Sequence, residues 1–107
     1  MATRHADPGE RVDLETWADD LPEARTKVIA RTDRMELIRL FLPAGKELSS
    51  HKVTGPLTVQ CIRGRAEFTA MGATQPLEPG QLLYLMPQEL HAVKAVEDTV
   101  ILLTLIF

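Results

Sequence analysis

From residue 26 onward, short apolar runs alternate with turns that are rich in glycine and proline. The runs cover Thr26–Ala30, Arg34–Leu42, Thr58–Ile62, Arg65–Ala70, Thr74–Leu77, Gln81–Leu85, His91–Val96 and Thr99–Phe107. Their lengths and their period of two are typical of β-strands, and Met71-Gly72-Ala73 predicts a hairpin turn. About nine short strands without a long helix indicate a sandwich or a small antiparallel barrel.

Two of these runs are apolar on both faces of the predicted strand. In Arg34–Leu42 one face carries Met35, Leu37, Arg39 and Phe41, and the other carries Glu36, Ile38, Leu40 and Leu42. The run Thr99–Phe107 would be an aggregation hazard if it were exposed, so we expect it in the centre of a sheet or under another subunit. Because one small core cannot bury all of these faces, we expect an isologous homodimer.

The first 25 residues have a different pattern. Residues 1–11 are polar and contain Pro8-Gly9, which predicts a poorly ordered arm. Asp13–Asp20 predicts a short helix around Leu14 and Trp17 that ends before Pro22. We therefore expect an N-terminal arm and short helix over residues 1–25 and one β-barrel over residues 26–107.

Composition narrows the choice of partners and compartment. The 107 residues suit one domain, and the net charge of −3 comes with no basic cluster that would predict nucleic-acid binding. No apolar run is long enough to span a bilayer, and residues 1–13 do not have the pattern of a signal peptide. The single Cys61 lies in an apolar run, which is typical of a buried, reduced thiol in a cytoplasmic protein.

Two histidine-containing segments have the spacing of a known barrel motif. The matching positions are Gly45, His51 and Gly64 in the first segment and Gly80 and His91 in the second, where Pro87 is displaced by one position from the proline of the motif. With the strand order, they resemble the cupin superfamily, in particular its small single-domain conserved-barrel (cupin 2-like) proteins. The resemblance covers residues 34–107. It implies an all-β, antiparallel, jelly-roll-type β-barrel, to which the sequence adds a short N-terminal helix.

The resemblance also implies a metal site, but the ligand set here is incomplete. Cupins commonly bind one metal through two histidines and a glutamate of the first motif and one histidine of the second. In this chain His51 and His91 match, while Val53 and Leu57 stand at the other two positions. Since a durable site normally has three or more protein ligands, we expect no cofactor and at most a weakly bound divalent transition metal.

The barrel mouth remains the default ligand site. If Leu57 faces inward, Cys61 does too and Gln60 faces away, so a His-His-Cys site stays open as an alternative. The expected pocket consists of His51, Val53, Leu57, Cys61, Met86, Gln88 and His91. Its expected guest is a small organic molecule with an apolar body.

Three functional hypotheses follow. The first is a small cytoplasmic cupin-fold protein that binds a small organic molecule, with no catalytic residue assigned. The alternative is a metal-dependent oxygenase or isomerase with a reduced His51/His91 site. Acid-base catalysis by either histidine without a metal would need a carboxylate to orient the ring, and the nearby Glu47 and Glu89 are expected in loops. A third is a sensor domain of the kind found beside DNA-binding modules, although no helix-turn-helix pattern is present.

Overall fold

The computed structural model describes residues 5–17 and 26–107, except for the side chains of residues 49–51. The described residues form nine strands: β1 (Thr26–Arg31), β2 (Met35–Leu42), β3 (Glu47–His51), β4 (Leu57–Arg63), β5 (Ala66–Ala70), β6 (Ala73–Leu77), β7 (Leu82–Leu85), β8 (His91–Ala95) and β9 (Thr99–Ile106). Among these residues, no helix is long and apolar enough to cross a membrane.

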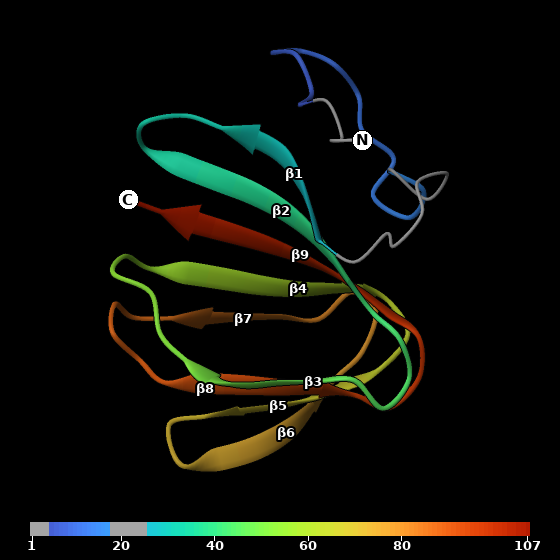
Figure 1. The fold of residues 1–107 in the computed structure, drawn as a ribbon, viewed down its shortest axis with the longest axis vertical. Helices are drawn as coiled ribbons and strands as arrows, with labels where there is room; N and C mark the ends of the chain where they lie inside the picture. The colour runs from blue at the N-terminus through green and yellow to red at the C-terminus, as the bar shows by residue number, and fades with distance from the viewer. Residues whose placement is uncertain (1–4, 18–25) are drawn as a thin grey trace.

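The strands form two antiparallel sheets that face each other (Figure 1). Sheet A has five strands in the order β1-β2-β9-β4-β7, and sheet B has four in the order β3-β8-β5-β6. Neighbours in these orders are mostly distant in sequence, as in a jelly roll. The expected antiparallel β-barrel architecture is therefore confirmed.

Strand alternation places the core between the sheets. In β4, Leu57, Val59 and Cys61 are buried, while the residues between them are only partly buried. The inner face of β8 is formed in the same way by His91, Val93 and Ala95. The prediction that Leu57 and Cys61 share the inner face and that Gln60 does not is confirmed.

The apolar strand β9 lies in the centre of sheet A, as expected for a segment that would aggregate if exposed. It pairs with β2 along its whole length, from Met35 opposite Ile106 to Leu42 opposite Thr99. On its other side it pairs with β4, where Leu57 lies opposite Leu105. Both edges of β9 are therefore covered within the chain itself.

The expected loop before His51 is a strand in the structure, so this prediction was wrong. The segment Glu47–His51 is mostly polar, and its partners on β8 are 40 or more residues away in the chain. Glu47 lies opposite Lys94, which on its other side lies opposite Glu67. These charges lie on the exposed outer face of sheet B, where cross-strand pairs of opposite charge stabilise a polar strand.

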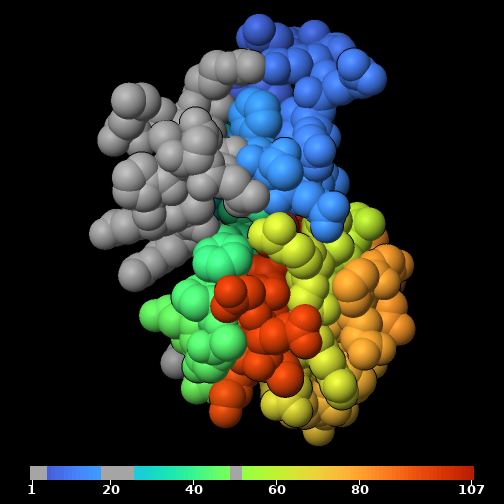
Figure 2. All heavy atoms as spheres, turned by 90° about the vertical axis from the view of Figure 1, so that its right-hand side faces the viewer, coloured from blue at the N-terminus to red at the C-terminus, as the bar shows by residue number. Residues whose placement is uncertain are grey.

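The N-terminal segment forms a single turn where a short helix was expected. Trp17 N–H donates to Asp13 O at 2.9 Å, and Glu15 N–H donates to the Asp13 carboxylate at 3.0 Å, as at a helix N-cap. Residues 14–17 are a turn, and the remainder of the expected helix, 18–20, lies outside the described residues. Residues 5–17, blue in Figures 1 and 2, lie beyond the β1 side of the barrel.

Candidate functional site

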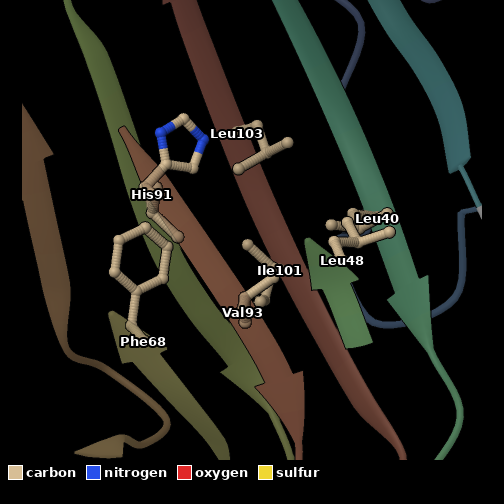
Figure 3. A pocket seen from close by; sticks show the side chains of 8 residues that line it. Leu40, Leu48, Phe68, His91, Val93, Ile101 and Leu103 are labelled. Atoms are coloured by element: carbon tan, nitrogen blue, oxygen red, sulfur yellow. The ribbon is translucent and has the colours of Figure 1, made fainter. Parts of the chain in front are cut away.

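His91 opens strand β8 and points into the barrel between the two sheets (Figure 3). Its ring is stacked on Phe68, with centroids 5.8 Å apart and planes 8° from parallel. Nδ1 lies 3.2 Å from the carbonyl oxygen of Glu89, so a proton on Nδ1 would donate to that oxygen. The side chain is buried, with an exposed fraction of 5%. This imidazole is therefore held in a defined orientation by its own loop and by an aromatic neighbour.

The ring lines a small cavity in the barrel interior (Figure 3). The cavity has a volume of about 20 Å³, and its lining residues are Leu40, Leu48, Val59, Phe68, His91, Val93, Ile101 and Leu103. Among the side chains that the structure describes, His91 is the one polar member of this lining. A space of this size accommodates roughly one water molecule, whereas pockets for organic ligands usually have several hundred Å³. The interior around His91 is thus filled almost completely by apolar side chains.

A larger groove lies next to this cavity at the end of β9. Its volume is about 250 Å³, and its lining residues are Val53, Thr54, Gly55, Leu105, Ile106 and Phe107. Leu105 follows Leu103 by two positions, so the groove and the cavity share one face of β9. Ile106 N–H donates to Pro56 O at 3.0 Å, which fixes the 53–56 loop against the strand.

The two predicted ligand histidines are brought together by the backbone. In the register of β3 and β8, His51 lies directly opposite His91, after an irregularity in the pairing that follows Leu48. The side chain of His51 lies outside the described atoms. Directly opposite residues in an antiparallel pair have Cβ atoms about 5 Å apart, so the strands place these positions within range of a shared ligand.

The other predicted pocket residues have different surroundings. Val53 packs against the core and lines the groove, and Leu57 is buried in the core. Met86 is 60% exposed. Gln88 is also exposed; its φ is +69°, and its N–H donates to Val53 O at 2.9 Å. This bond joins the loop before His91 to the loop after His51.

Cys61 is buried in the same core and lies opposite Ile101 of the cavity lining, but it is not itself one of the residues that line the cavity. Its Sγ lies 3.6 Å from Arg63 O and 3.8 Å from Gly64 O, at the turn that follows β4. Burial raises the pKa of this thiol, which favours the protonated form over the thiolate that a metal would require. In the described part of the chain, no three His, Cys, Asp or Glu residues are grouped so that they could hold a metal ion.

Of the eight residues that line the cavity, all but His91 were missing from the predicted pocket residues. Phe68, Ile101 and Leu103 line the cavity from β5 and β9. Their alternate apolar positions predicted burial, but not which of them would surround His91. That information depends on the order of strands across both sheets.

Comparison with known proteins identifies the architecture. No protein-family model and no curated protein matches the sequence. Among solved structures, a conserved protein of unknown function from Streptococcus pyogenes matches with a TM-score of 0.78 and 21% identity, covering 99% of this chain and 94% of that one. A cupin superfamily protein from Desulfitobacterium hafniense matches with a TM-score of 0.76 and 20% identity, over 82% and 85% of the two chains. The protein has the cupin fold.

An RmlC-like cupin from Desulfovibrio desulfuricans gives the same result over nearly the full length. Its TM-score is 0.71 and its identity 23%, with 96% of this chain and 95% of that chain covered. These likenesses establish the cupin fold, in agreement with the resemblance in the glycine and histidine spacing. In this cupin fold the inner positions 53 and 57 are apolar.

Proposed function

We propose that this cupin-fold protein is a cytoplasmic binding protein for a small organic molecule with an apolar body and one polar group. The observation that supports the proposal is the buried His91 imidazole, a polar side chain in the otherwise apolar described lining of a cavity beside an apolar groove. A neutral imidazole can donate or accept one hydrogen bond, which orients a ligand without requiring a charge. Ligand sites commonly combine apolar walls with a few polar groups of this kind.

The volumes restrict how such a ligand would bind. The cavity at His91 accommodates about one water, so the apolar body would occupy the 250 Å³ groove at the mouth. Its polar group would reach His91 once the side chains of Leu105, which lines the groove, and Leu103, which lines the cavity, change rotamer. The proposed ligand is therefore compact.

A fragment screen tests the proposal. Compact apolar fragments that carry one hydroxyl, amide or carboxylate would be ranked by the rise in melting temperature that they cause. A ligand at a hundred times its Kd stabilises a protein by about 2.7 kcal/mol. Val53→Trp, which fills the groove, should abolish the rise, whereas Lys94→Gln on the exposed face of sheet B should not. Hits that survive Val53→Trp, or a screen without hits, would contradict the proposal.

A metal-dependent oxygenase or isomerase is the second candidate. The observation that favours it is the register that places His51 opposite His91. Elemental analysis of protein purified without a histidine tag is the decisive measurement. Near-stoichiometric iron, zinc, nickel or manganese that is lost in His51→Ala would support this candidate over the first, and protein that takes up no metal would exclude it.

We also propose that the protein forms a homodimer through the outer face of sheet A. On β7 the outward side chains of Leu82 and Tyr84 are 54% and 66% exposed, and their partners on β4 are the uncharged Gln60 and Thr58. In an isologous dimer the same patch of both protomers forms the interface. An uncharged patch then meets no like charge, whereas the charged outer face of sheet B would meet its own charges. Tyr84→Glu should give monomers in sedimentation experiments. A stable wild-type monomer at micromolar concentration would refute the dimer.

A further inference from the structure

Arg39 is a buried cation on the outer face of β2. Strand alternation predicts that this position points away from the core, and yet only 1% of its surface is exposed. Burial of a charged side chain is strongly unfavourable unless hydrogen bonds replace its water shell. The N-terminal turn supplies these bonds, because residues 14–17 lie directly over the guanidinium.

Three backbone carbonyls of the turn accept hydrogen bonds from this one side chain. Nε donates to Leu14 O at 2.7 Å, Nη1 donates to Trp17 O at 2.9 Å, and Nη2 donates to Glu15 O. Carbonyls at the end of a helical turn lack partners within the turn and carry partial negative charge. The planar guanidinium presents several N–H groups in fixed directions, which suits three acceptors that diverge from one turn.

The position of Arg39 in the sheet determines what the turn covers. A row of cross-strand partners runs over the outer face of sheet A through Lys27, Arg39, Leu102, Gln60 and Leu82. At the Arg39 end the row is buried under the turn, and at the Leu82 end it is exposed. The N-terminal turn therefore divides this face into a covered part and an open part.

We propose that Arg39 holds residues 13–17, which we call the strap, against sheet A. The strap opens as a unit while the barrel stays folded. The register of β2, β9 and β4 is complete without the strap, so its release breaks no ladder of the sheet. Release would uncover the outer face around Arg39 and Leu102. The strap thus sets how much of this face is available to a partner, whether or not the chain binds a small molecule.

Hydrogen exchange measured on Arg39→Met tests this role of Arg39, with Arg65→Met as the control. The control substitution also removes one positive charge. The side chain of Arg65, however, is 49% exposed and lies on the turn after β4. In Arg39→Met the Trp17 amide, which bonds to Asp13 O, should exchange at least about tenfold faster, because charged hydrogen bonds are lost. The emission of Trp17, the only tryptophan, should move to longer wavelength. Amides of β4 and β9 should keep their protection.

Two results would overturn the proposal. Unchanged exchange and emission in Arg39→Met would show that Arg39 does not hold the strap. An equal loss of protection in β4 and β9 would show that strap and barrel unfold together. If Arg39→Met does not fold, Asp13→Ala serves instead, because it weakens the turn through its cap and alters no barrel residue. The same two readouts decide the outcome, with faster exchange confined to residues 13–17 as the expected result.

Discussion

Two glycines with nearly the same backbone conformation should respond very differently to the addition of one methyl group. Gly45 has a φ of +84° and Gly64 a φ of +89°, so alanine is strained at both positions. At Gly45 an added Cβ meets nothing within 4 Å. At Gly64 it would lie 2.2 Å from Asp98 O and 2.8 Å from Thr99 Cα, which are backbone atoms that cannot rotate away. The pair therefore separates conformational strain from steric conflict.

The expected magnitudes follow from these contacts. Gly45→Ala should cost the left-handed strain alone, about 1–2 kcal/mol. Gly64→Ala should cost the same strain and also disturb the hydroxyl of Thr99, which accepts from Arg65 N–H at 3.1 Å and lies 2.9 Å from Arg65 O. With each of the two lost hydrogen bonds contributing about 1 kcal/mol, the total reaches roughly 3–4 kcal/mol. That is a large part of the stability of a domain of this size.

Urea unfolding followed by far-ultraviolet circular dichroism measures both variants. With a slope of about 2 kcal/mol per molar urea, the midpoint should fall by roughly 0.5–1 M for Gly45→Ala and by roughly 1.5–2 M for Gly64→Ala. All samples must be measured at the same protein concentration, because dimer formation makes the urea midpoint depend on protein concentration. Equal shifts in the two variants would refute the argument from steric conflict.

Two further predictions concern the core. Burial raises the pKa of the Cys61 thiol above its ordinary value of 9.0, so its contribution to stability is complete below that pH and is lost as the pH rises through the folded-state pKa. Cys61→Ala should reduce the fall in unfolding free energy between about pH 8 and about pH 10 in urea titrations. Leu57→Ala removes a buried core side chain and should cost about 2–5 kcal/mol. Met86→Ala, at an exposed position, should stay within about 0.5 kcal/mol of the parent in the same assay.

Local patterns were enough to predict most of the strands and turns. Alternation in 57–61 predicted the inward positions of Leu57 and Cys61, and the structure confirms them. The hairpin at Met71-Gly72 was also predicted, and both residues have positive φ, at 53° and 77°. These features depend on the conformations of neighbouring residues, which the sequence specifies directly.

Features that depend on distant residues were missed. Strand β3 has no apolar alternation and becomes a strand through its pairing with β8. Arg39 was placed on the correct strand, but its burial depends on carbonyls 22 to 25 residues away. The small cavity at His91 results from how eight side chains of different strands fill the barrel, which no local spacing specifies.

The central position of β9 has a consequence for synthesis of the protein. Sheet A consists of two pairs, β1-β2 and β4-β7, which are joined only by β9. Residues 99–106 leave the ribosome after every other strand of the sheet. Until then β2 and β4 each present an unpaired edge, and such edges promote association of nascent chains. A chain whose synthesis stops before Thr99 would therefore have its five-stranded sheet split into two separate pairs of strands.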